Sequence, residues 1–391
     1  MANKSGRIVL AANARPGVGG QGVNFAQFVE ALCPQFDVTA FGQARYPGVA
    51  GFQIAESRLV NLMDKIPIVR GLHAHRDYLS NTHFDNYVAR HMPPADLFQG
   101  VTGQCLKALR RAKMMGATTI LDCITTHVDD FFEKQREEGL RLGIRPVISR
   151  AAREMALAEY SIAARIRVMS NYAKQTMLEH GVPEKQVFVA RPPLAVDRFP
   201  VAKFDEPRFR VSYVGMLRPA KGFRYLIDAF RSLPEPDLEL VFWSAPGNRV
   251  INKYLQRQIS LDARIRMQPL SVRDNYGEVY GKSHVLVHPS LADGYSYAVM
   301  EAMASGLPVI VTSSTGSAEL IRDGENGYVV PPCDSDAIRD RLSHLAHNPE
   351  LLRRMGSAAR ETIRLETPDS FRHSYTAKIQ SLIAKRQSCS A

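Results

Sequence analysis

Short runs of apolar residues alternate with longer segments of helical spacing along the first 180 positions. A β-branched run at 7–10 is followed by a glycine-rich turn at 16–22 and by a helical pattern at 25–32. The same succession of strand, loop and helix then recurs. Strands are predicted at 37–41 and 118–122, helices at 104–115, 149–164 and 171–180, and an apolar segment at 166–170. Strands that alternate with helices predict a parallel sheet covered on both faces.

The alternation is interrupted by a proline-rich, polar stretch near the middle of the chain. Pro192, Pro193 and Pro200 disfavour a helix or a central strand, and the polar segment 203–208 follows them. The alternation then restarts. Strands are predicted at 210–214, 238–243, 285–288, 308–312 and 327–330, with helices ending near 230 and spanning 296–304. We interpret the interruption as a linker between two α/β units.

The length of 391 residues supports this division, because a single hydrophobic core normally stops growing at about 250–300 residues. We predict two doubly wound, Rossmann-like domains, at 1–200 and 201–368, that face each other across a cleft. The segment 369–391 contains a predicted helix at 370–384 without a strand of its own. We expect this helix to pack back on the first domain.

Composition narrows the class of protein. Hydrophobic residues make up 45% of the chain and charged residues 23%, close to the average of soluble globular proteins. The five cysteines are scattered without C-x-x-C spacing, so neither a zinc site nor a disulfide framework is indicated. We find no apolar window near 18 residues in length and no pattern typical of a signal peptide. We therefore expect a cytoplasmic protein.

The formal charge of +11 favours anionic partners. Nucleotides, phospholipid head groups and lipid-linked diphosphates all qualify, whereas nucleic acid is disfavoured because zinc-finger spacing and RNP-like motifs are missing. Four cations gather on one predicted helix: Lys107, Arg110, Arg111 and Lys113. They form either a solvated helix face or a contact with an anionic membrane surface.

Two acids, Asp293 and Glu301, stand eight positions apart across a predicted loop-to-helix junction. The start of that helix, at Ser296 and Tyr297, presents free backbone N–H groups and the positive end of the helix dipole, which suit a phosphate. A carboxylate that accepts two adjacent hydroxyls can hold a ribose or a hexose. The pattern fits a nucleotide sugar, but it also fits a helix-start aspartate followed by a solvated glutamate.

A long ordered set of residues surrounds these acids. It consists of Pro289-Ser290, Asp293-Gly294-Tyr295-Ser296, 301–309, Glu319, Gly324, Asn326-Gly327 and Pro332. This set resembles the donor-binding half of the family 4 retaining glycosyltransferases, which implies the GT-B fold and a nucleotide diphosphate sugar as donor. In that family two glutamates are separated by seven residues, the first associated with the transferred sugar and the second with the ribose. The first is Asp293 here, which is shorter by one methylene, roughly 1.5 Å.

A second loop, at 213–222, resembles the part of the family that clamps the donor diphosphate. Lys221 stands where the family has its lysine, whereas the family's arginine is replaced by Met216. Arg218 is the predicted substitute, and a solvent-exposed arginine is the alternative. Two cations are needed because the leaving diphosphate gains negative charge as the glycosidic bond breaks, and fixed cations can replace a metal ion.

The first half of the chain offers three further candidates. Gly20 and Gly22 are predicted to let the backbone approach the donor phosphate or the acceptor. A dinucleotide site is disfavoured, because the third glycine of G-x-G-x-x-G is missing. His127 follows the predicted strand 118–122, where the family often has a threonine and a histidine. It is predicted to bond the transferred sugar or the departing phosphate, with a structural role as the alternative.

The resemblance implies a retaining, metal-independent hexosyltransferase, with His127 and Asp293 as the predicted catalytic residues. It would move a hexose from a nucleotide diphosphate sugar to a hydroxyl acceptor in polysaccharide, glycolipid or glycoconjugate synthesis, with no cofactor. A lipid-linked acceptor would place it on the inner face of the cell membrane. The alternatives are a sugar- or nucleotide-binding protein that has lost transfer and a phosphorylase or epimerase of the same fold. The nucleobase, the acceptor and the oligomeric state stay open.

Overall fold

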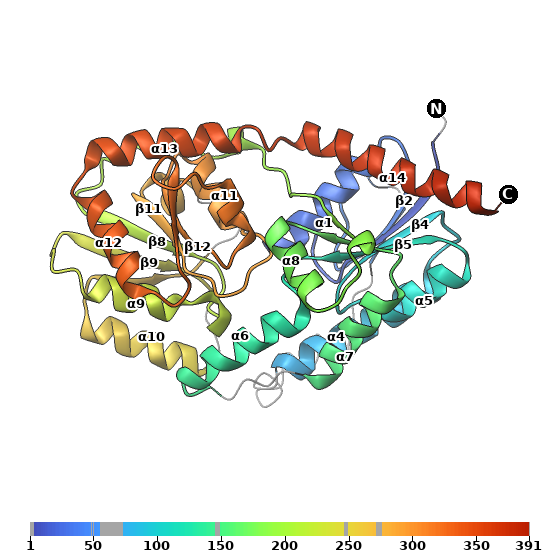
Figure 1. Ribbon diagram of the computed structural model, residues 1–391, viewed down its shortest axis with the longest axis horizontal. Helices are drawn as coiled ribbons and strands as arrows, with labels where there is room; N and C mark the ends of the chain where they lie inside the picture. The colour runs from blue at the N-terminus through green and yellow to red at the C-terminus, as the bar shows by residue number, and fades with distance from the viewer. Residues whose placement is uncertain are drawn as a thin grey trace.

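The protein consists of two α/β units, each built on a parallel sheet (Figure 1). The computed structural model describes residues 4–47, 49, 51–54, 73–144, 149–245, 249–270 and 276–390. The α/β class and the doubly wound topology that the alternating pattern predicts are both confirmed in this part of the chain.

The first unit is a seven-stranded sheet with the order β3-β2-β1-β4-β5-β6-β7. Its strands are β1 (Arg7–Ala11), β2 (Asp37–Gly42), β3 (Gly51–Ile54), β4 (Leu97–Val101), β5 (Thr118–Cys123), β6 (Arg165–Val168) and β7 (Val187–Val189). Its helices are α1 (Gly19–Leu32), α4 (His73–His91), α5 (Leu106–Met114), α6 (Val128–Arg141), α7 (Arg150–Ile162) and α8 (Asn171–Glu179). The strand order reverses between β1 and β4, which is the position where ligands of such sheets bind.

The second unit repeats this topology with six strands in the order β10-β9-β8-β11-β12-β13. Its strands are β8 (Phe209–Val214), β9 (Leu238–Trp243), β10 (Ile265–Gln268), β11 (Val285–His288), β12 (Val309–Thr312) and β13 (Gly327–Val330). Its helices are α9 (Phe223–Arg231), α10 (Arg249–Leu261), α11 (Tyr297–Ala304), α12 (Ser335–Ala346) and α13 (Pro349–Ile363). The reversal falls between β8 and β11, so the loops after these two strands are the candidates for a site.

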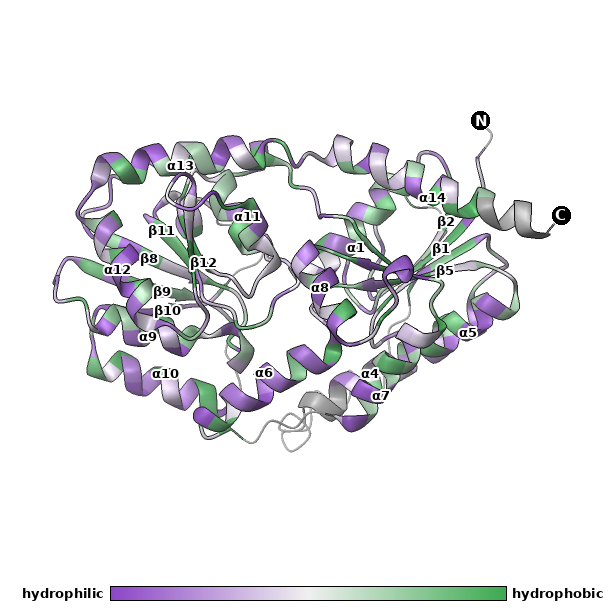
Figure 2. Ribbon diagram, in the orientation of Figure 1, coloured by the Kyte–Doolittle hydropathy of each residue, from purple (hydrophilic) through white to green (hydrophobic). Residues whose placement is uncertain are grey.

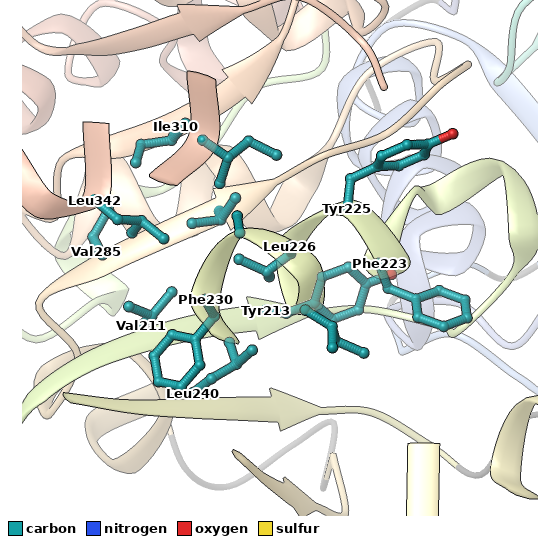
Figure 3. Packing of buried hydrophobic residues seen from close by; sticks show 14 of the residues in the cluster. Val211, Tyr213, Phe223, Tyr225, Leu226, Phe230, Leu240, Val285, Ile310 and Leu342 are labelled. Carbon is teal, nitrogen blue, oxygen red and sulfur yellow. The ribbon is translucent and has the colours of Figure 1, made fainter. Parts of the chain in front are cut away.

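Each sheet is buried between layers of amphipathic helices. Figure 2 shows hydrophobic strands flanked by helices whose colour alternates between polar and apolar. In the second unit, Phe223, Leu226 and Phe230 of α9 pack on Val211 and Leu240 of the sheet (Figure 3). All five side chains are fully buried. Burial of these apolar side chains stabilises the sheet and so fixes the positions of the strand ends, where the polar loops begin.

The last helix, α14 (Pro368–Ser390), leaves the second unit and lies along α1 of the first (Figure 1). Phe371 and Tyr375 pack against Phe28 of α1. Tyr375 also donates its hydroxyl to Gln99 Oε1 of β4 at 2.8 Å. The tail therefore forms part of the first unit's core, although it is almost 200 residues away in sequence. The domain boundaries at residues 200 and 368 stay predictions.

The predicted elements match the observed ones closely except at the first glycine-rich turn. The turn was expected to extend through Gly22, but α1 already begins at Gly19. Gly17 and Gly19 have positive φ values of 75° and 65°, so the tight turn ends at the first residue of the helix and does not extend to Gly22. Among the helices of the described residues, none is long and apolar enough to cross a membrane.

Candidate active site

The carboxyl ends of the two sheets meet where the loops after β5 and β11 touch. Ser170, just after β6, donates its hydroxyl to the carbonyl of Gly294 at 2.8 Å. A Cβ added to Gly294 would lie 2.8 Å from the carbonyl oxygen of Ile124, so only glycine fits between the two loops. Ligands of open α/β sheets bind outside the carboxyl ends of the strands. This junction is therefore the candidate active site.

Asp293 lies in the loop between β11 and α11 and is held by two basic side chains. Lys221 Nζ is 2.5 Å and His288 Nε2 is 2.8 Å from the same oxygen, Oδ2. The aspartate is 7% exposed and His288 is 5% exposed, so the three groups interact largely out of water. We call these three side chains, Lys221, His288 and Asp293, the Asp293 cluster.

The charge state of the Asp293 cluster follows from its packing. Burial opposes ionisation of Asp293, but the Lys221 charge and the His288 hydrogen bond outweigh it and lower its pKa to about 2. Burial lowers the pKa of His288, whose ring is therefore neutral. Because the ionised carboxylate can only accept, the neutral ring must donate from Nε2. The cluster thus presents one carboxylate and one ammonium group at neutral pH.

The loop that carries Lys221 is fixed by backbone contacts. It forms the short helix η3 (Pro219–Lys221) and ends at Gly222, whose φ is 63°. A Cβ on Gly222 would lie 1.9 Å from the carbonyl oxygen of Pro289, so no other residue fits there. Arg218, the other predicted diphosphate ligand, is exposed, and its guanidinium lies 3.9 Å from the sulfur of Met216. The loop therefore presents Lys221 to Asp293, while Arg218 lies at the surface.

Glu301 lies one turn inside α11, on the same helix end as the Asp293 loop. Tyr280 donates its hydroxyl to Glu301 Oε2 at 2.6 Å. Burial raises the pKa of Glu301 to about 7, although the Tyr280 hydrogen bond acts in the opposite direction. The carboxyl group is thus partly protonated at neutral pH.

The amino ends of α1 and α11 abut each other across the two units. A Cβ on Gly20, in the first turn of α1, would lie 3.5 Å from the ring of Tyr297, the first residue of α11. Tyr297 donates its hydroxyl to Gln27 Oε1 at 2.8 Å. Within the part of the chain that the structure describes, no side chain caps either helix start. Uncapped N–H groups of two helices at one place favour an anion.

Two other predicted ligands lie beside these helix starts. The backbone N–H of Ser296 donates to Ser317 Oγ at 2.8 Å, so this N–H has a protein partner. A Cβ on Gly22 would lie 2.0 Å from the carbonyl oxygen of Arg15. Close packing alone therefore explains why this position is a glycine. A role of Ser296 or Gly22 in donor binding stays a prediction.

His127 packs inside the first unit and is not part of the Asp293 cluster. Its Nδ1 accepts the backbone N–H of Asp129 at 3.2 Å, so the ring caps α6. The ring stacks on His180 at 4.2 Å and lies 5.1 Å from Tyr160. Burial and His180 lower the pKa of His127 to about 4, so it is neutral. The geometry favours the structural alternative for this residue.

Sequence reasoning missed residues that hold the site together. His288 stands at the end of a predicted strand five positions before Asp293, and this spacing was an available signal. Tyr280 lies 21 positions before Glu301, and nothing in the sequence around it indicates a contact with that glutamate. Glu319 accepts the backbone N–H of Tyr172 at 2.8 Å and pairs with Arg191 at 2.8 Å, so it joins the second unit to the first. Glu319 belongs to the sequence motif, but the motif does not indicate its partners Tyr172 and Arg191.

A metal centre was not expected from the sequence. Across the described ranges, the structure contains no group of three or more histidine, cysteine, aspartate or glutamate residues arranged to hold a metal ion.

Solved structures with the same architecture identify the fold. HepE from Anabaena, solved in complex with UDP-glucose, superposes with a TM-score of 0.72 over 96% of this chain and 100% of its own, at 15% identity. Sucrose-phosphate synthase from Thermosynechococcus elongatus superposes with a TM-score of 0.70 over 97% of this chain and 99% of its own, at 19% identity. The protein has the GT-B fold, as predicted.

Sequence comparison finds a family model that matches the second unit. Residues 197–362 match the model of the family described as Glycosyl transferases group 1. This part of the chain is similar to that family, which confirms the predicted resemblance over the second unit.

Two curated relatives resemble the same half of the chain. A putative glycosyltransferase EpsD of Bacillus subtilis (strain 168) is 32% identical over 161 residues, 41% of this chain and 42% of EpsD. A D-inositol 3-phosphate glycosyltransferase of Corynebacterium glutamicum (strain R) is 30% identical over 162 residues, 39% of each chain. The matches thus span about two fifths of the length of these relatives.

Proposed function

We propose that the protein is a glycosyltransferase that takes a sugar from a nucleotide diphosphate donor and transfers it to a hydroxyl acceptor with retention of configuration. The observation that carries the proposal is the Asp293 cluster at the junction of the two sheets. There an ionised carboxylate, a buried neutral histidine and a lysine stand in and around the loop that leads into α11, the helix that carries Glu301. This combination suits a ligand with hydroxyls at one end and phosphates in the middle.

Each group has a role in the proposed reaction. Asp293 accepts hydroxyls of the transferred sugar, and the His288 bond to Oδ2 fixes the orientation of its carboxylate. Lys221 and the helix starts of α1 and α11 stabilise the negative charge that grows on the leaving diphosphate, the task a metal ion performs in other transferases. Glu301 accepts the two ribose hydroxyls. The departing phosphate takes the proton of the acceptor hydroxyl on the same face of the sugar.

The donor that we propose is taken from a similar solved structure, and the acceptor is inferred from the surface of α5. HepE was solved with UDP-glucose, which makes UDP-sugars the first donors to test. The four cations of α5 named above are all exposed, and Met114 at the end of this helix is 80% exposed. A basic helix with an exposed apolar end supports contact with an anionic membrane surface, where lipid-linked acceptors reside.

The test is a donor screen followed by a product analysis. The purified protein is incubated with UDP-, GDP- and ADP-sugars, with and without sugar and lipid-linked acceptors, and release of the nucleoside diphosphate is measured. Transfer is expected for one nucleobase and should persist in EDTA. The anomeric configuration of the product is then read by NMR. Nucleotide binding without transfer or donor hydrolysis, under every condition, would favour the sugar- or nucleotide-binding alternative instead.

A further inference from the structure

Helix α6 belongs to the first unit but ends against the second (Figure 1). It begins after His127, beside the first sheet; farther along, it lies against η3 and is hydrogen-bonded to the start of α9. Beyond its end, Ile144 is 8% exposed and belongs to the hydrophobic core of the second unit, against which Leu142 also packs. Apolar contacts therefore hold the far end of α6 on the second unit.

A buried carboxylate strengthens this contact. Glu138 of α6 is 1% exposed and accepts hydrogen bonds from Arg224 Nε at 2.8 Å and from the Tyr225 hydroxyl at 2.9 Å. Arg141 bonds both Glu138, at 3.2 Å, and the Tyr225 hydroxyl, at 2.9 Å. A buried carboxylate is tolerated only with partners of this kind, so α6 has a defined position on α9.

One turn before Glu138, on the same helix face, Gln135 reaches the loop of Lys221. Its Oε1 accepts the backbone N–H of Ala220 at 3.0 Å. On the other side of the loop, the carbonyl of Ala220 accepts the backbone N–H of Leu291 at 2.8 Å. The residue next to Lys221 is thus bonded to the first unit through its N–H and to the second through its carbonyl.

We infer that Gln135 is a positioning residue for Lys221, so that a helix of the first unit completes the diphosphate site of the second. The inference rests on the proposed function and deepens it. Without the Gln135 oxygen, the Ala220 N–H loses its partner and the loop can adopt other conformations. The Lys221 ammonium group is then less pre-organised for a diphosphate. Gln135 does not touch the donor, and it acts only through the loop.

The test compares two nearly isosteric substitutions with a control on the same helix. Gln135→Met removes the accepting oxygen, and Gln135→Glu retains one. Arg136→Ala changes the next residue, which is exposed. The variants are titrated calorimetrically with UDP, GDP and ADP at 0.5 M salt, which screens the charge of the glutamate variant. Binding of the nucleotide that the native chain accepts should be about five-fold weaker in Gln135→Met, as expected for one lost hydrogen bond. Gln135→Glu should stay within about two-fold of the native chain, and Arg136→Ala should be unchanged.

A second measurement separates the failure of this inference from the failure of the proposed function. Hydrogen exchange of the segment 215–222, measured without nucleotide, should be faster in Gln135→Met than in the native protein, the glutamate variant or the control. Unchanged exchange together with native nucleotide affinity in Gln135→Met would overturn the positioning role. If the native chain bound none of UDP, GDP and ADP, the proposed function would fall, and the exchange rates would still decide whether Gln135 holds the loop.

Discussion

Replacing Asp293 by asparagine tests both the electrostatics of the site and its proposed chemistry. The amide has nearly the same shape but no charge, so Lys221 and His288 lose an ionised partner. Because the pKa of Asp293 falls from 3.8 in the unfolded chain to about 2 in the folded protein, the ionised carboxylate contributes about 2 kcal/mol to the free energy of unfolding at neutral pH. We expect Asp293→Asn to lose a similar amount at pH 7.

The sign of this contribution predicts its pH dependence. A group whose pKa is lower in the folded state stabilises the fold above its unfolded pKa, and the contribution is lost as the pH falls towards the folded pKa. The difference between the native protein and Asp293→Asn should therefore be full at pH 7, and roughly half of it should be gone by pH 3. Urea unfolding of both proteins at several pH values measures this difference, and the effects of all other carboxylates cancel.

Activity provides the second part of the same test. If Asp293 binds the transferred sugar, Asp293→Asn should retain UDP affinity within a few-fold and lose sugar transfer by two orders of magnitude or more. Asp369→Asn, in the exposed first turn of α14, is a matched control for the substitution itself. Turnover at the native level in Asp293→Asn would remove this residue from the mechanism, and a pH-independent stability difference would refute the electrostatic reasoning.

Four further predictions follow from the geometry. Lys221→Ala should weaken UDP binding at least ten-fold, whereas Arg218→Ala should weaken it less, because Arg218 is exposed; equal losses would refute this ranking. Tyr280→Phe removes the hydrogen bond that lowers the pKa of Glu301, so the pH at which UDP affinity increases should move upward from about 7 in calorimetric titrations. His127→Ala removes the cap of α6 and should cost about 1 kcal/mol in urea unfolding while turnover stays within a few-fold; a hundred-fold loss of turnover would restore the catalytic role predicted from the sequence. Neutralising the exposed cations of α5 should reduce co-sedimentation with anionic liposomes, and binding that does not depend on lipid charge would argue against a membrane contact.

The sequence predicted the fold well because its local patterns and the topology agree. Residues 285–288 and 327–330 form strands with the predicted bounds, since each is a short apolar run between polar loops. The start of α1 was misplaced because three glycines within four residues resemble a turn, although the first helical turn accepts them. Local pattern could not distinguish these two conformations.

The site was predictable only where its partners are close in sequence or lie within the family motif. Asp293 and Lys221 were identified separately, and the structure brings them to 2.5 Å. The bond from Gln135 to Ala220 joins residues 85 positions apart in different units, and nothing in the spacing of either segment indicates it. His127 is the opposite case, because a histidine after a strand resembles a site residue, and the structure shows that its ring caps α6. Its catalytic role stays a prediction.

The packing of α14 on the first unit has a consequence for folding during synthesis. The apolar face of α1, including Phe28 and Leu32, is covered by side chains that the ribosome adds almost 200 residues after β7, among them Tyr375 and Ile379. At typical rates of synthesis this delay is on the order of ten seconds or more. During that time the second unit can fold completely, while the first still exposes an apolar surface. The unit that begins the chain is thus expected to mature last, and a fragment that ends before α14 should aggregate.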